Sequence, residues 1–366
     1  MMQERRKQKA SKGRRICRTI LILIVILLAV AAGYVIYAFA AYDRLEDRME
    51  LTVYRQIHAK PAADQKLRVL SYNIGFGAYS DDYSCFMDGG EESRARSPEA
   101  VRQNIAGALD AVTEYDPDLV LLQEVDFDST RSHHIDQRQL VADRMREYAC
   151  VFAQNYDSPY LMWPIHAPHG ANKAGMMTLS RYGIASALRR SLPIEEGPMM
   201  MVDLDRCYSV SRIPTANGKE IALYNFHLSA YTSDGTIAQE QLALLFQDME
   251  AERERGNYVI AGGDFNKDLL GNSGEVFGVC CDGANWAQPI PEEMIPDGFR
   301  IEAPFDCREK IPSCRNADRP YGSDSFVLTI DGFILSDNVE TVESAVADTQ
   351  FRWSDHNPVW VTVRLK

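Results

Sequence analysis

The chain has 366 residues, of which 46% are hydrophobic and 25% charged, a balance that excludes a disordered polypeptide and suits a large globular domain. Its formal net charge is −13, and residues 1–19 carry eight basic side chains against one acidic one, which leaves −20 for the remainder. So acidic a remainder disfavours nonspecific binding to long nucleic acids, because that binding depends on many lysine and arginine contacts to phosphate.

The basic tail, residues 1–19, precedes an uninterrupted apolar run over residues 20–41. This run has no charged side chain and is long enough to cross about 30 Å of hydrocarbon as a transmembrane helix. Because basic residues concentrate before the run, we expect a single-pass membrane protein with a cytoplasmic N-terminus and an extracytoplasmic remainder. The alternative is a cleaved signal peptide, but the run exceeds the apolar core of about 7–15 residues that is usual for such peptides.

Residues 42–66 are charged and end in a Pro-Ala-Ala-Asp segment, which predicts a juxtamembrane helix followed by an irregular linker. From residue 67 to residue 366, β-rich runs alternate with helical patterns, as is typical of one α/β domain. Helices are predicted at residues 97–115, 136–148 and 235–255. The predicted strands are Leu67–Ile74, Leu119–Gln123, Met176–Ser180, Ile221–His227, Tyr258–Gly262, Ile330–Leu335 and Val359–Leu365.

Seven of the eight cysteines follow the apolar run, so at least one should be unpaired or pair between chains. Cys307 and Cys314, with the neighbouring Cys280 and Cys281 upstream, are disulfide candidates in an exported domain. The sequence has no CxxC pair, which argues against a zinc knuckle.

Polar residues stand at the ends of the predicted strands, and a layered α/β fold gathers such positions at one rim. Each alone is more often a helix cap or turn former. Together, oxygen ligands without cysteine suit Mg²⁺, with Mn²⁺ or Ca²⁺ possible, and two imidazoles beside a hard cation suit attack on phosphorus. The residues are Asn73 in LSYNIG, Gln123 and Glu124 in LLQEVD, Asn225 and His227 in LYNFHLS, Asp264 and Asn266 in GGDFN, Asp331 in TIDGF, and Asp355 and His356 in WSDHNP.

In order and spacing, the motifs SYN, QE, HL, GDFN, ID and SDH resemble those of the endonuclease/exonuclease/phosphatase superfamily, which includes deoxyribonucleases and neutral sphingomyelinases. The resemblance covers residues 67–366 and implies a catalytic domain there. It also implies a four-layer α/β sandwich, in which two mixed sheets pack face to face with helices outside. The implied activity is metal-dependent phosphoester hydrolysis.

The same resemblance implies a metal site. Glu124 looks like the principal metal ligand, with Asn73 beside it and Asp355 as a further carboxylate on the metal side. Asn266 is similar to the amide that supports metal and phosphate.

The resemblance also implies catalytic roles. Asp264 looks like the residue that orients or deprotonates the attacking water, and His356, held by Asp331, looks like the imidazole that contacts phosphate. His227 matches the histidine of deoxyribonucleases and sphingomyelinases. Deoxyribonucleases pair that histidine with a glutamate expected near residues 172–175, where this sequence has no carboxylate.

Other residues are weaker candidates. Asn225, Arg206 and Asn172 are candidates for substrate binding, and a structural role is the alternative for each. The adjacent His133 and His134 suggest a second metal site or a substrate contact, and the alternative is a loop before a helix start. We favour the loop because no fixed third ligand is evident.

Tryptophans such as Trp163 and Trp353 could line a substrate cleft, although packing in the core is the more common use of this residue. Trp353 has the stronger claim because it directly precedes the SDH motif.

The sequence therefore favours hydrolysis of a phosphodiester, in a lipid head group or small organic phosphate, by in-line attack of activated water. The alternatives are a nuclease acting on DNA or RNA and a catalytically inactive binding module. The expected partners are the membrane, through the N-terminal helix, and a phosphoester substrate that is lipid or small molecule in preference to nucleic acid. No protein partner is inferred.

Overall fold

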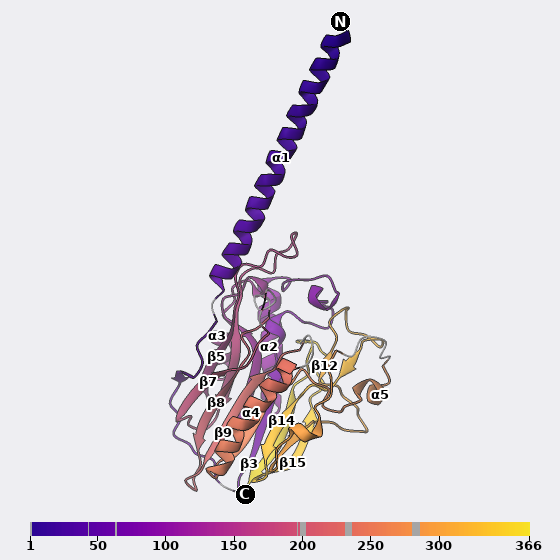
Figure 1. The fold of residues 1–366 in the computed structure, drawn as a ribbon. Coiled ribbons are helices and arrows are strands. Elements are labelled where there is room, and N and C mark those ends of the chain that lie inside the picture. The colour runs from indigo at the N-terminus through magenta and orange to yellow at the C-terminus, as the bar shows by residue number, and fades with distance from the viewer. Residues whose placement is uncertain are drawn as a thin grey trace. The chain divides into compact units, whose positions relative to one another are not determined.

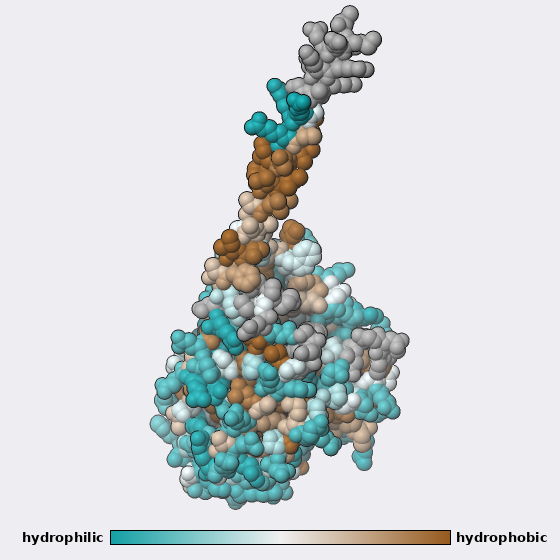
Figure 2. All heavy atoms as spheres, viewed as in Figure 1, coloured by the Kyte–Doolittle hydropathy of each residue, from teal (hydrophilic) through white to brown (hydrophobic). Residues whose placement is uncertain are grey.

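The computed structural model describes residues 2–42, 44–62, 64–195, 197, 203–230, 236–279 and 286–366. It divides into two compact units, Met1–Asp43 and Arg44–Lys366. The first unit consists of helix α1, Met2–Ala41, and its stretch Lys12–Ala41 is long and apolar enough to cross a membrane. Figure 2 shows this hydrophobic stretch, and it shows a mostly hydrophilic surface on the visible face of the second unit.

Two seven-stranded sheets form the second unit (Figure 1). The first contains, in spatial order, β1 (Met49–Glu50), β7 (Ser186–Ser191), β8 (Cys207–Pro214), β9 (Glu220–His227), β10 (Tyr258–Asp264), β14 (Asp331–Ser336) and β11 (Phe299–Glu302). The second contains β15 (Val339–Val346), β16 (Val359–Leu365), β3 (Lys66–Asn73), β4 (Leu119–Asp126), β6 (Lys173–Ser180), β5 (Ala149–Asp157) and β2 (Val53–Tyr54). Both sheets are mixed, because β9 pairs with β10 and β3 with β4 in parallel while their other pairs are antiparallel.

Alternation along the strands divides the core into layers. On β3, Leu67 and Val69 join the hydrophobic cluster between the two sheets, whereas Leu70 and Tyr72 join a second cluster on the outer face. Successive side chains of a strand point to opposite faces, so one strand contributes to both clusters. A short ribbon of β12 (Cys314–Arg315) and β13 (Val327–Leu328) lies outside the two sheets.

Helices cover the outer faces. α2, Pro98–Glu114, begins after Ser97, whose Oγ accepts a hydrogen bond from the backbone N–H of Ala100 at 3.1 Å, as expected of an N-cap. It shares the outer cluster of β3 and β4, and α4, Thr236–Glu254, shares the outer cluster of β8, β9 and β10. The remaining helices are α3 (Gln137–Arg144) and α5 (Ser273–Phe277). The four-layer α/β sandwich with two mixed sheets is thus confirmed.

The segment predicted as a linker, residues 42–66, differs from the expectation. β1 pairs with β7 and β2 with β5, so each sheet takes a short strand from this segment. Arg189 also donates from Nη1 to the backbone oxygen of Glu46 at 2.9 Å. The expected juxtamembrane helix is wrong for the part described, and the compact unit begins at Arg44.

Two of the four disulfide candidates, Cys307 and Cys314, form no disulfide in the structure. Both thiols are free in the structure; Cys307 is exposed, whereas Cys314 is buried on β12. Cys280 and Cys281 lie outside the described residues.

Candidate active site

The site residues continue the inward-facing register of the core strands. On β10, Tyr258 and Ile260 lie in the cluster between the sheets, and the same alternation brings Asp264 inward at the end of the strand. The strand ends meet at one edge of the two sheets, which we call the rim. The same register places Asn73 on β3, Asn225 and His227 on β9, and Asp331 on β14.

Glu124 reaches the rim by a different route. The pairing of β4 with β6 shifts register between Leu122 and Val125, and Glu124 has a positive φ of 54°. Such a bulge changes the direction of a side chain that regular alternation would turn to the outer face. Asn73 donates from Nδ2 to Glu124 Oε1 at 3.2 Å.

Asp264 is the centre of the site. Its Oδ2 accepts from Asn73 Nδ2 at 3.2 Å and lies 3.4 Å from His227 Nε2 and 3.7 Å from His356 Nε2. Its Oδ1 accepts from the backbone N–H of Asn266 at 2.9 Å. Burial raises the pKa of Asp264 to about 7, against the opposing effect of the positive charge on His356.

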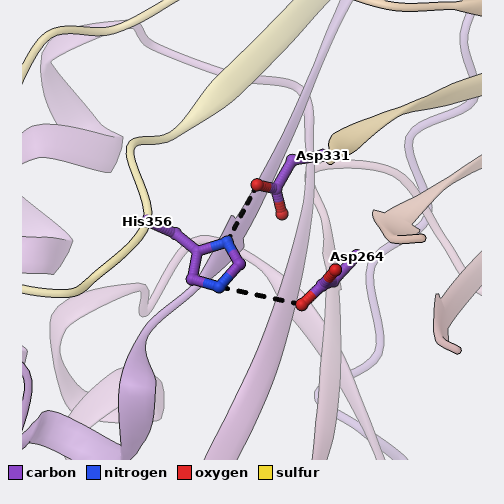
Figure 3. A group of neighbouring side chains, drawn as sticks. All are labelled: Asp264, Asp331 and His356. Atoms are coloured by element: carbon purple, nitrogen blue, oxygen red, sulfur yellow. Dashed lines mark hydrogen bonds and ion pairs between the residues drawn. The ribbon is translucent and has the colours of Figure 1, made fainter. Parts of the chain in front are cut away.

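His356 and Asp331 form a buried pair, with 2.8 Å between Nδ1 and Oδ2. Figure 3 shows the imidazole of His356 between the carboxylates of Asp331 and Asp264. Burial alone would lower the pKa of His356, but the negative charge of Asp331 and the nearby Cys314 thiol outweigh it and hold this pKa well above its usual value. This environment favours the cationic form of His356.

His227 has the opposite character. Burial, with the positive charges of Arg206 and His356 nearby, lowers the pKa of His227 far below its usual value, so its imidazole is neutral. Its Nδ1 atom has no hydrogen-bond partner among the described residues. This agrees with the lack of a carboxylate at residues 172–175, where deoxyribonucleases supply one.

Glu124 and Asp355 form a carboxylate pair suited to a divalent cation. Burial raises the pKa of Glu124, and the negative charge of Asp355 adds to this effect against the opposing charge of Arg131. Ser354 Oγ lies 3.2 Å from Asp355 Oδ1 and donates to the backbone oxygen of Asn73 at 2.8 Å, which fixes Asp355 beside β3. A bound cation would relieve the repulsion between these carboxylates, and oxygen donors of this kind suit Mg²⁺, Mn²⁺ or Ca²⁺.

Two further observations bear on the metal ligands. The Oδ1 atom of Asn73 accepts a hydrogen bond of 3.0 Å from the backbone N–H of Gly75. Its Nδ2 atom therefore faces the carboxylates and bridges Glu124 and Asp264. In addition, ligand atoms of Asp264, Asp331 and His356 lie within 4.8 Å of one another, a grouping that could also hold an ion.

Two of the substrate-binding candidates make internal contacts instead. The amide of Asn225 donates to the backbone oxygen of Met177 at 3.0 Å, and that of Asn172 donates to the backbone oxygen of Gly170 at 3.2 Å. Both side chains are fully buried. Asn225 therefore ties the two sheets together behind the site, and Asn172 shapes a loop, so neither presents a free donor to a substrate.

Arg206 and Asn266 lie closer to the reacting groups. Arg206 Nη1 and Asn266 Nδ2 each donate to the backbone oxygen of Leu228 at 2.8 Å. Arg206 also bonds Asp203, and its Nε has no partner among the described residues. A buried guanidinium with an unused donor beside His227 is a suitable anion contact.

Several supporting residues had no sequence signal. Arg131 is buried, pairs with Asp126 at 2.8 Å and stacks 3.9 Å from the ring centre of Phe76, behind Glu124. Ser313 Oγ donates to Asp331 Oδ2 at 2.8 Å. Arg131 lies on the short 3-10 helix Thr130–Ser132 and Ser313 lies in a loop. Their roles depend on burial and on their partners, which residue type alone does not reveal.

The remaining candidates lie apart from this centre. His133 bonds the backbone oxygen of Ala95 and His134 bonds Asp128, so the two imidazoles use separate partners and the loop interpretation holds. Trp353 packs against the outer core cluster of β3 and α2 rather than opening onto a cleft.

The comparisons with known proteins agree with this fold. An endonuclease/exonuclease/phosphatase protein from Beutenbergia cavernae is similar at 18% identity with a TM-score of 0.58, covering 82% of this chain and 72% of its own. ANGEL2, a 2′,3′-cyclic phosphatase solved with adenosine-2′,3′-vanadate, has 15% identity and a TM-score of 0.55, covering 87% and 99%. TDP2 from D. rerio, solved with a single-stranded DNA product, has 16% identity and a TM-score of 0.51, covering 82% and 99%.

No curated protein sequence matches the chain. A sequence profile, however, matches residues 70–356, a range that includes all six motifs. The chain thus belongs to the Endonuclease/Exonuclease/phosphatase family, whose members are metal-dependent phosphoesterases and nucleases.

Proposed function

We propose that this chain is a membrane-anchored phosphodiesterase that hydrolyses a lipid head group or a small organic phosphodiester with the help of Mg²⁺. The observation that carries the proposal is the position of Asp264 between a neutral imidazole and a cationic one, His227 and His356. A base beside a fixed positive charge is what water attack on a phosphodiester requires.

In this proposal, each residue of the site has a separate role in the reaction. Asp264, whose pKa of about 7 is that of an effective base at neutral pH, accepts the proton of the attacking water. His356, kept cationic by Asp331, stabilises the negative charge that develops on the phosphate oxygens or protonates the leaving oxygen. His227 and Asn73 hold Asp264 in position from the other side.

Glu124 and Asp355 would hold the cation, which supplies charge neutralisation for the phosphate and its leaving oxygen. The acidic surface and the apolar helix support a lipid or small substrate over long DNA. All the reactive groups are present, which argues against an inactive binding module.

The test is turnover of a soluble chromogenic phosphodiester by the full chain in detergent. Asp264→Asn and His356→Ala should each lower kcat by at least about 100-fold, and the double variant should lose little more, because the two residues act as one unit. A chelator should abolish wild-type turnover, and Mg²⁺ should restore it. Asp337→Asn, which changes an exposed carboxylate paired with Arg253, is the matched control and should retain activity. Two modest, additive losses, or full activity in excess chelator, would contradict the assignment.

A further inference from the structure

The connection between β5 and β6, residues 158–172, is a loop held by hydrogen bonds. Leu161 and Gly170 exchange two backbone hydrogen bonds of 3.0 Å across its base. His169 is buried and donates from Nδ1 to the backbone oxygen of Ser93 at 2.8 Å. These contacts hold the base of the loop and His169 against the domain, and the tip projects beyond them.

The tip of the loop exposes large apolar side chains. Met162 is 51% exposed, Trp163 67% and Ile165 75%, the last being the most exposed large hydrophobic residue described. Single exposed apolar residues are ordinary, but a group of them on a fixed projection marks a contact surface. Tryptophan beside aliphatic residues is the combination favoured at the boundary between lipid and water.

Strand directions place this loop at the rim of the active site. β6 is antiparallel to both β4 and β5, so β4 and β5 run in parallel and end at the same edge. The chain just beyond Glu124 contacts the base of the loop directly, since the backbone N–H of Phe127 donates to the oxygen of Lys173 at 3.0 Å. The apolar tip thus belongs to the end of the domain that carries the catalytic groups.

The chain also enters this domain at the rim. Arg189 donates from Nε to the backbone oxygen of Gln154, near the end of β5, at 2.7 Å and from Nη1 to that of Glu46 at 2.9 Å. The candidate membrane span ends at Ala41, and the compact unit begins at Arg44. Because each residue extends the chain by about 3.6 Å at most, a span that crosses a bilayer keeps this entry within roughly 10–15 Å of its end.

We propose that the loop tip, Met162–Ile165, inserts into the surface of the bilayer that α1 crosses, and so turns the active-site rim toward the lipid head groups. The occupant is a lipid surface because chain continuity brings a bilayer to this end of the domain and the tip is apolar. The contact between the loop tip and lipid does not depend on the proposed function. The inference that this contact gives access to a lipid phosphodiester rests on the proposed function.

The contact itself is tested by fluorescence of the full chain in proteoliposomes. The difference between wild type and Trp163→Phe isolates the emission of Trp163 from that of the other tryptophans. Phosphatidylcholine brominated on its acyl chains should quench this difference signal strongly, and aqueous acrylamide should quench it weakly. The reverse pattern, with quenching by acrylamide and none by brominated lipid, would overturn the proposal and leave a protein partner as the occupant.

A second variant connects the contact to catalysis. Ile165→Asp should lower turnover of a phosphodiester lipid in liposomes by about tenfold, because a charged tip no longer enters the interface. Turnover of a soluble chromogenic phosphodiester should not change. Val342→Asp, at an apolar side chain exposed on β15, is the matched control and should affect neither substrate. An equal loss on both substrates, or no loss on either, would overturn the proposal.

The two experiments separate this inference from the proposed function. If the wild type cleaves no lipid and no soluble phosphodiester, the proposed function fails, and the quenching measurement still decides whether the tip lies in the membrane. If cleavage occurs but the tip lies in water, the proposed function survives and the orientation is wrong.

Discussion

His227 and His356 occupy similar places in the sequence, each close to a strand end, yet the structure favours the neutral form of His227 and the cationic form of His356. His356 has Asp331 at 2.8 Å, whereas His227 has no carboxylate at Nδ1 and lies near Arg206. The motif pattern predicted that both belong to the site, and the structure brings both to Asp264. The sequence could not predict their protonation, because that depends on burial and on partners from distant segments.

At the residue scale, His169 should make stability depend on pH. Burial lowers its pKa to about 4, from an ordinary value of 6.5, so between these values the unfolded chain binds a proton that the folded chain excludes. The contribution of His169 to stability is fully present above about pH 6.5 and is lost as the pH falls toward 4, by on the order of 3 kcal/mol. Urea unfolding of the detergent-solubilised chain at several pH values measures this.

His169→Gln should flatten that pH dependence relative to wild type, and His166→Gln, at an exposed imidazole in the same loop, should leave it unchanged. Identical pH curves for wild type and His169→Gln would show that the imidazole titrates normally in the folded state.

Among the secondary-structure elements, those with strong local signals were predicted well. The helix expected at residues 97–115 is observed as Pro98–Glu114, and the strand expected at Ile221–His227 is β9. Two of the missed strands contain several polar or charged residues: β7 reads SALRRS and β15 reads VETVESAV. Their apolar content is too low to produce a sequence pattern that predicts a strand. They form because neighbouring strands offer unpaired backbone groups.

The position of Glu124 shows a second limit of the sequence. The motif predicted that Glu124 is a metal ligand, but the alternation of Leu119 and Leu121 turns Gln123 inward instead. Only the bulge at Glu124 brings its carboxylate to the rim, and bulges leave no reliable sequence pattern.

The packing of α2 should be sensitive to one methyl group. A Cβ added at Gly107 would lie 2.4 Å from the ring of Trp353, which directly precedes the segment of Ser354, Asp355 and His356. Gly107→Ala gains about 1 kcal/mol of helix propensity but should lose more, because overpacking costs about 1–3 kcal/mol and displaces Trp353. We expect a lower melting temperature together with lower kcat.

Combining Gly107→Ala with Trp353→Phe should recover part of the lost stability, since the smaller ring makes room for the methyl group. A single Gly107→Ala variant that is more stable than wild type, with full activity, would show that the packing of α2 against Trp353 does not affect the site.

In the whole molecule, the main difference from the sequence prediction lies between the apolar helix and the domain. Residues 42–66 were expected to be a tether of some length, but their strands and the Arg189 contact to Glu46 join them to the domain. The chain therefore has little slack between the candidate span and the active-site rim. A short connection favours substrates at the membrane surface more strongly than a long flexible one would.

The membrane orientation can be measured with Cys17 and Cys307, which are the exposed free cysteines in the described part of the chain. Because basic residues precede the span, a membrane-impermeant maleimide added to intact cells should label Cys307 and not Cys17, and lysis should make both reactive. Cys17→Ser and Cys307→Ser identify the two labels. The opposite pattern would reverse the orientation, and a Cys17 label that is absent even after lysis would favour a cleaved signal peptide.

The most direct test of the central claim compares substrates for the full chain in liposomes at physiological salt. Sphingomyelin, phosphatidylinositol species and nitrophenyl phosphodiesters are assayed beside nicking of plasmid DNA. We predict a higher kcat/KM for at least one lipid or small phosphodiester than for plasmid, because the field of a −20 domain repels DNA while the anchor concentrates membrane substrates. Efficient nicking of plasmid, with no turnover of any lipid or small phosphoester, would contradict the account and establish a nuclease instead.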